Sequence, residues 1–293
     1  MNTYFKQKTI ARNVALSGTG VHSGKKNNIT IKPAPENHGI KFLRVDLPGT
    51  QPVQALFKHV VDTSMATVLG ANGAIVSTIE HLMASFAGLG IDNALVEMDE
   101  YEMPIMDGSA KEFTQVFSAA GIVAQDMPKH FMIVRQKIRM EEGDKFVEVI
   151  PEPCFKITCS IDFDHPLIGK QALTYDRAKN NFEREISHAR TFGFVRDLEL
   201  LKRFSLGKGG SLDNAIVMDN DKVLNPDGLR YPDEFVRHKL LDSLGDLSLL
   251  GMPIQGHIVS HKSGHTLNHK FIQKLLDNKD AWETGPATME SNT

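Results

Sequence analysis

The chain has 293 residues, of which 41% are hydrophobic and 24% charged, a balance typical of a folded globular protein and not of a disordered or coiled-coil one. With 33 basic and 36 acidic residues, the formal net charge is −3 and the basic side chains are scattered, so we expect no nucleic-acid partner. Because single hydrophobic cores tend to split beyond about 250 residues, the length predicts two domains.

The N-terminal sequence lacks the continuous apolar stretch of a secretory signal, and no run approaches the roughly 18 apolar residues of a membrane span. We therefore expect a cytoplasmic protein without a transmembrane segment. The two cysteines, Cys154 and Cys159, stand five residues apart in a strand-like stretch, which places them on opposite faces. Neither a disulfide nor a zinc knuckle is predicted from them.

The first half of the chain predicts strands, a helix, a strand and a second helix. Hydrophobic periodicity and turn residues place the strands at residues 9–16, 28–35 and 93–99, and the helices at residues 77–88 and 110–121. After residue 122 the pattern returns to strands, which predicts a domain boundary near residues 122–130.

The second half repeats this order. It predicts strands at residues 131–140, 145–151 and 155–163, a helix at 232–251 with Pro232 in its first turn, a strand at 255–261 and a helix at 267–278. The repeat predicts an α+β fold of two similar domains, each a sheet packed against a helix pair. The predicted domains are residues 1–124 and 130–284, followed by a disordered tail at residues 285–293.

The predicted helix at 232–251 carries His238, Asp242 and Asp246 at intervals of four residues, which places them on one face. A solvated polar stripe is the ordinary interpretation of such a pattern. If the two domains face each other, however, His81 of the equivalent helix can join His238 and Asp242. Two imidazoles and one carboxylate leave an open coordination position, which is the catalytic arrangement for Zn²⁺.

The sequence "STIEHLMA" contains Glu80 directly before His81. The ordinary interpretation is a carboxylate in the first turn of a helix, behind a Ser or Thr cap, and a histidine satisfied in the core. The alternative is that Glu80 is the general base for a water at the metal, since a base must lie within hydrogen-bond reach of that water.

A histidine cluster at His261, His265 and His269 follows near the C-terminus. His261 and His269 are interpreted as surface residues, because only geometry could assign them a role. His265 follows a glycine in a predicted loop, and is a candidate general acid that Asp246 orients and keeps protonated.

Six segments resemble one known family: "GTGVHSGKK", "STIEHL", "GLGIDNALVEMDEYEMPIMDGSA", "SHARTFGFVRD", "NPDGLRYPDEFVRHKLLDSLGDL" and "HKSGH". They extend from residue 18 to residue 265 in the order of the zinc-dependent UDP-3-O-acyl-N-acetylglucosamine deacetylases. The resemblance implies two similar α+β domains with an active site between their helical layers. It also implies hydrolysis of the acetamide of an acylated UDP-amino sugar, the committed step of lipid A synthesis, by a monomeric enzyme.

The resemblance also implies roles for individual residues. The implied ion is Zn²⁺, with Fe²⁺ as the alternative in the cell. The implied metal ligands and catalytic residues are His81, His238 and Asp242 for the ion, Glu80 as base, His265 as acid with Asp246 behind it, and Thr191 as a hydroxyl that stabilises the oxyanion.

A hydrophobic passage for the acyl chain and a site for the UDP group are implied as well. The passage residues are Phe192, Val195, Leu198, Leu201, Leu206, Gly210, Ser211, Ala215 and Val217, and the residues near the UDP group are Lys239, Lys262, Lys145 and Phe163. The ordinary alternatives are core packing for the apolar side chains and surface charge for the lysines.

Two other classes of protein use a similar ligand set. An Fe(II) oxygenase also binds its metal with two histidines and a carboxylate, but its usual His-x-Asp pair on a strand is missing here, and Glu80 beside His81 favours hydrolysis. A non-catalytic metal- or ligand-binding protein would keep the pocket without the chemistry, so its Glu80 and His265 would be replaceable.

Overall fold

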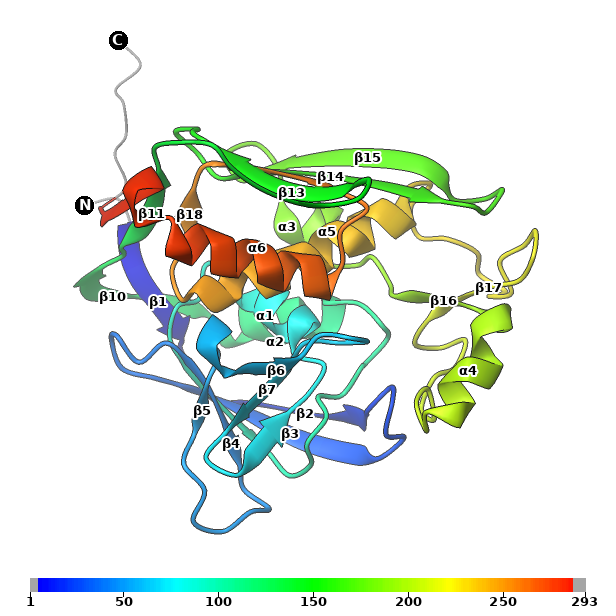
Figure 1. Ribbon diagram of the computed structural model, residues 1–293. Helices are drawn as coiled ribbons and strands as arrows, with labels where there is room; N and C mark the ends of the chain where they lie inside the picture. Colours follow the sequence, from blue (N-terminus) through cyan, green and yellow to red (C-terminus); the bar gives the residue numbers. More distant parts are fainter. Residues whose placement is uncertain (1–4, 287–293) are drawn as a thin grey trace.

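Two five-stranded sheets form the outer layers of the molecule, with helices between them (Figure 1). The computed structural model describes residues 5–286. The first sheet has the order β2(Val14–Thr19)-β3(Lys26–Pro33)-β9(Ala94–Met98)-β4(Ile40–Arg44)-β5(Val53–Gln54). The second has the order β12(Ile138–Glu142)-β13(Lys145–Ile150)-β19(His257–His261)-β14(Lys156–Phe163)-β15(Gly169–Asp176).

The two sheets have the same topology. In each, a hairpin pairs antiparallel with a central strand that comes late in the sequence, and this central strand pairs parallel with one strand of a second hairpin. Alternate residues of β3 and β14 are buried, because one face of each sheet packs against the helices. The fold is therefore α+β with an internal repeat, as the sequence predicts.

The helices repeat as well. Helix α1(Glu80–Leu89) precedes the central strand β9 and α2(Lys111–Ala120) follows it, whereas α5(Glu234–Leu247) precedes β19 and α6(His265–Asp277) follows it. The shorter helices are α3(Phe182–Glu185), α4(Leu198–Arg203) and the 3-10 turns η2(Phe57–His59), η3(Val195–Asp197), η4(Ser248–Leu250) and η5(Lys279–Ala281). Among the helices of residues 5–286, none has the length and apolar character needed to cross a membrane.

Four small sheets complete the described fold. They are β1(Lys6–Ile10) with β10(Ile122–Pro128), β6(Val60–Asp62)-β7(Val68–Ala71)-β8(Ala74–Val76), β18(Ile254–Gln255)-β11(Phe131–Val134)-β20(Trp282–Gly285), and β16(Phe192–Phe194) with β17(Ile216–Met218). Strands β16 and β17, with η3 and α4 between them, form a segment of residues 192–218 that projects from one side of the molecule (Figure 1). We name this segment the excursion.

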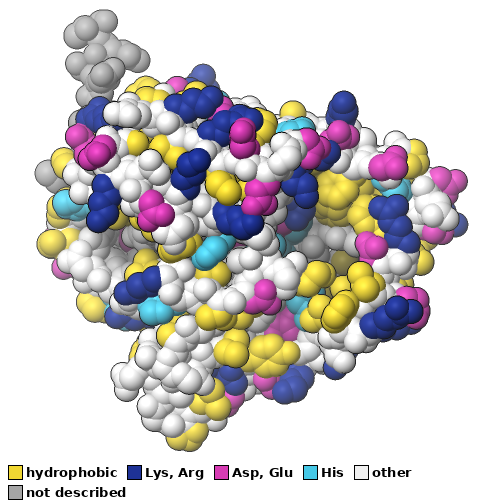
Figure 2. All heavy atoms as spheres, viewed as in Figure 1, with side chains coloured by type: hydrophobic (Ala, Val, Ile, Leu, Met, Phe, Trp, Pro, Cys, Tyr) yellow, Lys and Arg dark blue, Asp and Glu magenta, His cyan; other side chains and the backbone are white. Residues whose placement is uncertain are grey.

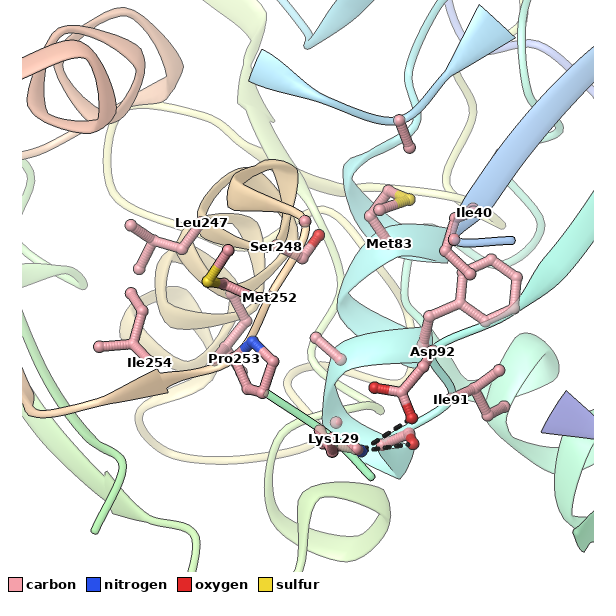
Figure 3. Close-up of a pocket in the computed structure, with 18 of the residues that line it drawn as sticks. Ile40, Met83, Ile91, Asp92, Lys129, Leu247, Ser248, Met252, Pro253 and Ile254 are labelled. Atoms are coloured by element: carbon pink, nitrogen blue, oxygen red, sulfur yellow. Dashed lines mark hydrogen bonds and ion pairs between the residues drawn. The ribbon is translucent and has the colours of Figure 1, made fainter. Parts of the chain in front are cut away.

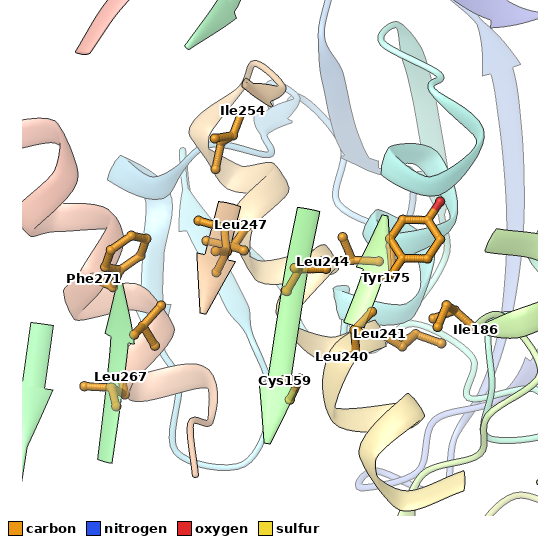
Figure 4. Packing of buried hydrophobic residues seen from close by; sticks show 14 of the residues in the cluster. Cys159, Tyr175, Ile186, Leu240, Leu241, Leu244, Leu247, Ile254, Leu267 and Phe271 are labelled. Carbon is orange, nitrogen blue, oxygen red and sulfur yellow. The ribbon is translucent and has the colours of Figure 1, made fainter. Parts of the chain in front are cut away.

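Helix α5 has an apolar face that packs on the second sheet. Figure 4 shows Leu240 and Leu244 of α5 together with Cys159 of β14, Tyr175 of β15 and Phe271 of α6. All are buried, and full burial of such a side chain stabilises the fold by about 1.5–3 kcal/mol. This packing fixes the axis of α5, and with it the direction of the polar side chains on the opposite face.

Helices α1 and α5 cross at Gly245. A Cβ at Gly245 would lie 2.1 Å from the backbone oxygen of Glu80, so only glycine allows the two helices to approach this closely. Ala84 of α1 belongs to the hydrophobic core of the second half, and Leu249 of η4 belongs to that of the first. The two helical layers are thus packed directly against each other.

Several predicted boundaries are wrong for local reasons. The helix predicted from residue 77 begins at Glu80, because Ser77 bridges Glu102 and Thr78 has a φ of 60°. Pro232 precedes α5 and lies outside its first turn. The helix expected to reach residue 251 is α-helical only to Leu247, and its last turn is 3-10.

Four further predictions concern one strand, the C-terminal tail, the domain division and the two cysteines. The single strand predicted at residues 131–140 is two strands, β11 and β12, which belong to different sheets. Gly285 pairs with Phe131 in β20, so the predicted tail begins too early, and its residues 287–293 lie outside the described residues. The predicted division into residues 1–124 and 130–284 stays a prediction, although β10 pairs with β1 as far as Pro128. Cys154 is exposed and Cys159 buried, both as free thiols, as predicted.

Candidate metal centre

His81, His238 and Asp242 come together between α1 and α5. All three are buried, and they offer ligand atoms that lie within 4.8 Å of one another. Asp242 Oδ1 is 3.3 Å from His238 Nε2 and 3.6 Å from His81 Nε2. The imidazole rings of His81 and His238 are 5.0 Å apart and nearly perpendicular. Residues 157 positions apart in the chain thus present three donor atoms to one point.

A backbone contact sets the orientation of the His238 ring. Its Nδ1 donates to the carbonyl oxygen of Ala189 at 3.1 Å, which leaves the lone pair on Nε2, the atom that faces Asp242 and His81. Burial lowers the pKa of His238 to about 3, so its imidazole is neutral at pH 7. A neutral imidazole with a fixed tautomer is the form that binds a metal ion.

Lys239 holds the other oxygen of Asp242. The Lys239 Nζ lies 2.7 Å from Asp242 Oδ2, and this pair leaves Oδ1 for the two histidines. Burial raises the pKa of Asp242, but His238 and Lys239 outweigh burial and hold the pKa well below its usual range. Asp242 is therefore ionised at neutral pH, with one oxygen directed to the centre.

These donors fit a divalent metal ion. Bonds of about 2.0–2.1 Å to Zn²⁺ in a tetrahedral arrangement separate neighbouring donor atoms by roughly 3.3 Å, close to both distances from Asp242 Oδ1. Two imidazoles and one carboxylate suit Zn²⁺ and also Fe²⁺. Three protein donors leave a fourth position of a tetrahedral ion for water or substrate.

Glu80 begins α1, directly before His81. Its side chain is 5% exposed, and no side chain caps the helix, so the expected Ser or Thr cap is absent. Glu80 Oε2 accepts a hydrogen bond from the backbone N–H of Thr67 at 3.2 Å. Burial raises the pKa of the Glu80 carboxyl, which makes the carboxylate a better proton acceptor.

Asp246 and His265 form a second polar pair beside the first. Asp246 Oδ2 is 2.9 Å from His265 Nδ1, and burial, which lowers the pKa of His265, is outweighed by Asp246, so that the pKa rises to about 10. Asp246 also accepts hydrogen bonds from Thr67 Oγ1 at 2.6 Å and from Asn268 Nδ2 at 2.8 Å. His265 is the first residue of α6, so the predicted loop position is wrong, since the helix starts directly after Gly264.

Thr191 lies in the segment that leads from Ala189 to β16. The Ala189 carbonyl contacts His238, and the ring centroid of Phe192 lies 6.3 Å from that of His238. Thr191 thus stands in the chain between two residues that lie close to His238. A buried ion pair, Arg190 to Glu234 with Nε and Oε1 2.9 Å apart, ties this segment to the first turn of α5. The Thr191 N–H donates to the Gly108 carbonyl at 2.7 Å.

The nine predicted passage residues lie along the excursion. Their elements are β16 for Phe192, η3 for Val195, α4 for Leu198 and Leu201, the loop that follows for Leu206, Gly210, Ser211 and Ala215, and β17 for Val217. Phe192 reaches the metal centre, whereas Leu198 is 43% exposed and Gly210 and Ser211 are exposed. Hydrophobic side chains gather around a hollow on this side of the molecule (Figure 2).

The four residues predicted near the UDP group all belong to the second half of the chain, on β13, on β14, on α5 and directly after β19. Lys239 contacts Asp242 of the metal centre, and Phe163 stacks edge-to-face on Phe192 with ring centroids 5.5 Å apart. Lys262 Nζ pairs with Asp144 Oδ2 at 2.6 Å, and Lys145 is exposed on the neighbouring strand β13. Lys145 and Lys262 thus lie at one end of the second sheet, where Lys262 Nζ is also 3.9 Å from Oδ2 of Asp162, the residue before Phe163.

Sequence reasoning missed two residues at the centre, Thr67 and Asn268. Thr67 bridges Glu80 and Asp246, which are 166 positions apart, and it is 2% exposed. Its segment carries no periodic pattern that marks it, so only the folded arrangement identifies it. Asn268 stands three residues after His265 on α6, a helical spacing that was a usable signal.

The chain is similar to known proteins over nearly its whole length. The family model for LpxC, UDP-3-O-acyl N-acetylglycosamine deacetylase, matches residues 7–277. The UDP-3-O-acyl-N-acetylglucosamine deacetylase of Myxococcus xanthus is 49% identical over 283 residues, which cover 97% of this chain and 90% of that protein.

Proteins of the same name from Acidithiobacillus ferrooxidans and Idiomarina loihiensis are 49% and 47% identical. Each alignment covers 95% of this chain and 92% of the relative. A family match and identities of 47–49% over 95–97% of the chain show that this chain has the same fold as these relatives. The chain therefore belongs to the family of UDP-3-O-acyl-N-acetylglucosamine deacetylases.

Proposed function

We propose that the chain hydrolyses the acetamide of a UDP-3-O-acyl-N-acetylglucosamine, releasing acetate and the free amine, in lipid A synthesis. The observation that carries the proposal is the convergence of His81, His238 and Asp242 beside two proton-transfer groups, Glu80 and His265. The names of the relatives supply the substrate. An amide hydrolase needs a proton acceptor and a proton donor on the two sides of the scissile bond, and these two groups provide them.

His81, His238 and Asp242 would hold a Zn²⁺ ion, with Fe²⁺ as the alternative. When bound, the ion supplies Lewis-acid activation of the carbonyl and of a water molecule. The remaining steps belong to the chain's own side chains.

Glu80 accepts a proton from the attacking water while the oxygen of that water bonds to the carbonyl carbon of the acetamide. The raised pKa of this buried carboxyl makes the transfer more favourable. Thr191 donates its hydroxyl to the oxygen that becomes negatively charged, and such a donor contributes about 3–4 kcal/mol to the transition state.

His265 donates a proton to the departing nitrogen. Asp246 keeps His265 in the imidazolium form, because its carboxylate raises the pKa of His265 to about 10. The C–N bond breaks and acetate and the amino sugar leave. Thr67 contacts both Glu80 and Asp246, and we assign it the role of holding the acceptor and donor sides in one arrangement.

The substrate-binding roles remain proposals of the same kind. The excursion of β16, η3, α4 and β17 would hold the acyl chain, with Phe192 at the metal end. Lys145 and Lys262, at one end of the second sheet, would bind the diphosphate.

A cytoplasmic location is supported by two free thiols, which persist in reducing compartments. We also propose that the protein is a monomer, which light scattering after size exclusion tests.

The test compares wild type with Glu80→Gln and His238→Ala, measuring bound metal and acetate release from the UDP-acyl sugar. Glu80→Gln should keep the metal and lose about 10²–10⁴-fold in rate, because only the proton acceptor is removed. His238→Ala should lose both metal and activity. Full turnover by Glu80→Gln would reject the proposed base and favour a protein that binds the same ligand without this chemistry.

A further inference from the structure

The excursion is attached to the first half of the chain at two places. At its root, the Gly108 carbonyl accepts a hydrogen bond from the Thr191 N–H at 2.7 Å, and a Cβ at Gly108 would lie 2.1 Å from the Asn214 backbone oxygen. At its tip, the loop after α4 donates hydrogen bonds to residues 20–25, which we name the β2–β3 turn (Figure 1). Helix α4 lies between these attachments and has no buried residue, so it adds no core packing that would hold the excursion in place.

Glu102 fixes the β2–β3 turn from the interior of the first half. Its side chain is buried, and its Oε1 accepts a hydrogen bond from the His22 N–H at 2.8 Å, while its Oε2 accepts one from the Ser23 N–H at 2.7 Å. A Cβ at Gly20 would lie 2.3 Å from Glu102 Oε2, so a glycine here lets the turn close over the carboxylate. Hydrogen bonds to an ionised carboxylate are stronger than those between neutral groups.

The same peptide groups connect Glu102 to the excursion. The two N–H groups that bond Glu102 belong to consecutive peptide groups, and among the described residues no peptide bond is cis. In a trans peptide group the N–H and the C=O point in opposite directions. On the far side, the Val21 carbonyl accepts from the Gly209 N–H at 3.1 Å and the His22 carbonyl accepts from the Lys208 N–H at 3.3 Å. Each carboxylate oxygen is thus linked through one peptide group to one N–H of the excursion.

The tip of the excursion is therefore sensitive to Glu102. A carboxylate bonded to an N–H polarises the peptide group, and such cooperativity strengthens the next hydrogen bond by about 10–30%. A Cβ at Gly209 would lie 2.2 Å from the Gly20 backbone oxygen, so the two loops are in direct backbone contact. Loss of a Glu102 bond leaves one peptide group free to rotate, and its carbonyl then no longer faces the excursion.

We propose that Glu102 is a positioning residue for the acyl chain of the substrate. Through the β2–β3 turn it holds the excursion in the arrangement that covers that chain, and it touches no reacting atom itself. The inference rests on the proposed function, in which the excursion binds the acyl chain. Because the gain from covering a chain grows with the apolar area removed from water, a long chain depends on this arrangement more than a short one.

A cavity of about 320 Å³ between α1 and α5 is the alternative place for the acyl chain (Figure 3). Figure 3 shows Leu247 and Met252 on one side of it and Met83 with Ile91 on the other. Of the described residues, none of the excursion and none of the β2–β3 turn lines this cavity. Ala87→Phe fills it from α1 and therefore separates the two possible binding places.

The test compares acetate release by wild type, Glu102→Gln and Gly209→Ala from a long-acyl UDP-amino sugar and from its 3-O-butanoyl counterpart. Glu102→Gln places an amide NH₂ where one carboxylate oxygen accepted an N–H. Gly209→Ala pushes the tip away from Gly20 and leaves Glu102 intact. Glu36→Gln is the matched control, because Glu36 also accepts two backbone N–H groups, but from β10.

We expect Glu102→Gln and Gly209→Ala to raise KM for the long-acyl substrate about three- to tenfold, as is typical of the loss of one or two hydrogen bonds. The kcat value, the bound metal and KM for the butanoyl substrate should stay unchanged. Glu36→Gln and Ala87→Phe should leave the ratio of the two KM values as in wild type. Without substrate, backbone amides of residues 207–210 should exchange hydrogen faster in Glu102→Gln than in wild type.

Three results would overturn the proposal. An equal rise in KM for both substrates, or a fall in kcat or bound metal alone, would make Glu102 a structural residue only. Unchanged hydrogen exchange at residues 207–210 would mean that Glu102 does not hold the excursion. A raised KM for the long-acyl substrate in Ala87→Phe, with none in Glu102→Gln, would place the acyl chain in the cavity.

Two further measurements keep the outcome decisive. If Glu102→Gln does not fold, Gly209→Ala, which alters a surface loop, decides by the same readouts. If wild type releases no acetate from either sugar, the proposed hydrolysis fails, and calorimetric binding of the two sugars takes the place of KM. Failure of the proposed function is therefore distinguishable from failure of this inference.

Discussion

The two halves of the molecule have the same strand order but contribute unequally to the centre. Helix α5 carries His238, Asp242 and Asp246 along three of its turns, whereas its counterpart α1 supplies only its first two residues, Glu80 and His81. The repeat therefore builds the scaffold, a pair of crossing helices. The chemistry comes from the different side chains that each copy places at the crossing.

The largest expected effect tests whether both halves are needed. His81→Ala and His238→Ala should each lower metal affinity by more than about 100-fold. Substitution of a residue that only orients a metal ligand already lowers metal affinity or activity by about 10–100-fold. Metal analysis after dialysis checks this, with His257→Ala, a histidine of β19, as the control. A His81→Ala protein that retains a full equivalent of metal would assign the ion to the second half alone.

The next effect concerns the proposed proton donor, His265, which lies with its partner Asp246 in the second half. Burial lowers the pKa of His265, and Asp246 contributes most to raising it to about 10, so Asp246→Asn should lower that pKa although Glu80 and Asp242 still raise it. In the proposed mechanism the imidazolium is the active form, so the alkaline limb of the pH–rate profile should move to lower pH, with a rate loss of about 10–100-fold. Asp164→Asn, an exposed position, is the control, and an unmoved limb in Asp246→Asn would contradict the assignment.

The same substitution has a consequence for stability. Because the folded pKa of His265 is raised above its ordinary value of about 6.5, its contribution is complete below that pH and is lost as the pH rises through about 10. Denaturant unfolding of chelator-treated wild type should therefore show a decline in this window that Asp246→Asn lacks.

A smaller effect tests the helix crossing itself. Gly245→Ala places a Cβ 2.1 Å from the Glu80 carbonyl oxygen, and we expect a loss of about 1–3 kcal/mol in the free energy of unfolding. Gly193→Ala, where a Cβ meets no atom within 4 Å, should stay within about 0.5 kcal/mol of wild type. Equal stability of the two variants would mean that the helices separate easily.

The smallest effect contrasts the buried crossing with the excursion. Leu201→Asp should raise KM for the acylated substrate several-fold and leave bound metal and stability unchanged, because this half-buried side chain of α4 lies outside both hydrophobic cores. Steady-state kinetics with long- and short-acyl substrates measure it. A similar change in KM for both substrates would mean that the excursion does not bind the acyl chain.

Local patterns and contacts between distant segments differ in how far the sequence predicts them. Regular periodicity identified α5 and β14, and the four-residue spacing of His238 and Asp242 placed both on one face. The start of α1 was missed because it depends on a positive φ at Thr78. Thr67 was missed because its partners, Glu80 and Asp246, lie in separate helices.

Lys239 shows the same limit in another way. The resemblance predicts Lys239 near the UDP group, which stays a prediction, and the structure adds a contact of its ammonium with Asp242 Oδ2. No pattern in the sequence distinguishes a lysine that binds substrate from one that positions a metal ligand. That distinction depends on which way the side chain lies along α5.

The most direct test of the account is an anomalous diffraction map recorded at the absorption edge of zinc on crystals of the metal-loaded protein. The account predicts a single peak between α1 and α5, about 2.0–2.2 Å from His81 Nε2, His238 Nε2 and Asp242 Oδ1. A peak bonded to the side chains of only one half, or none near these atoms, would contradict it.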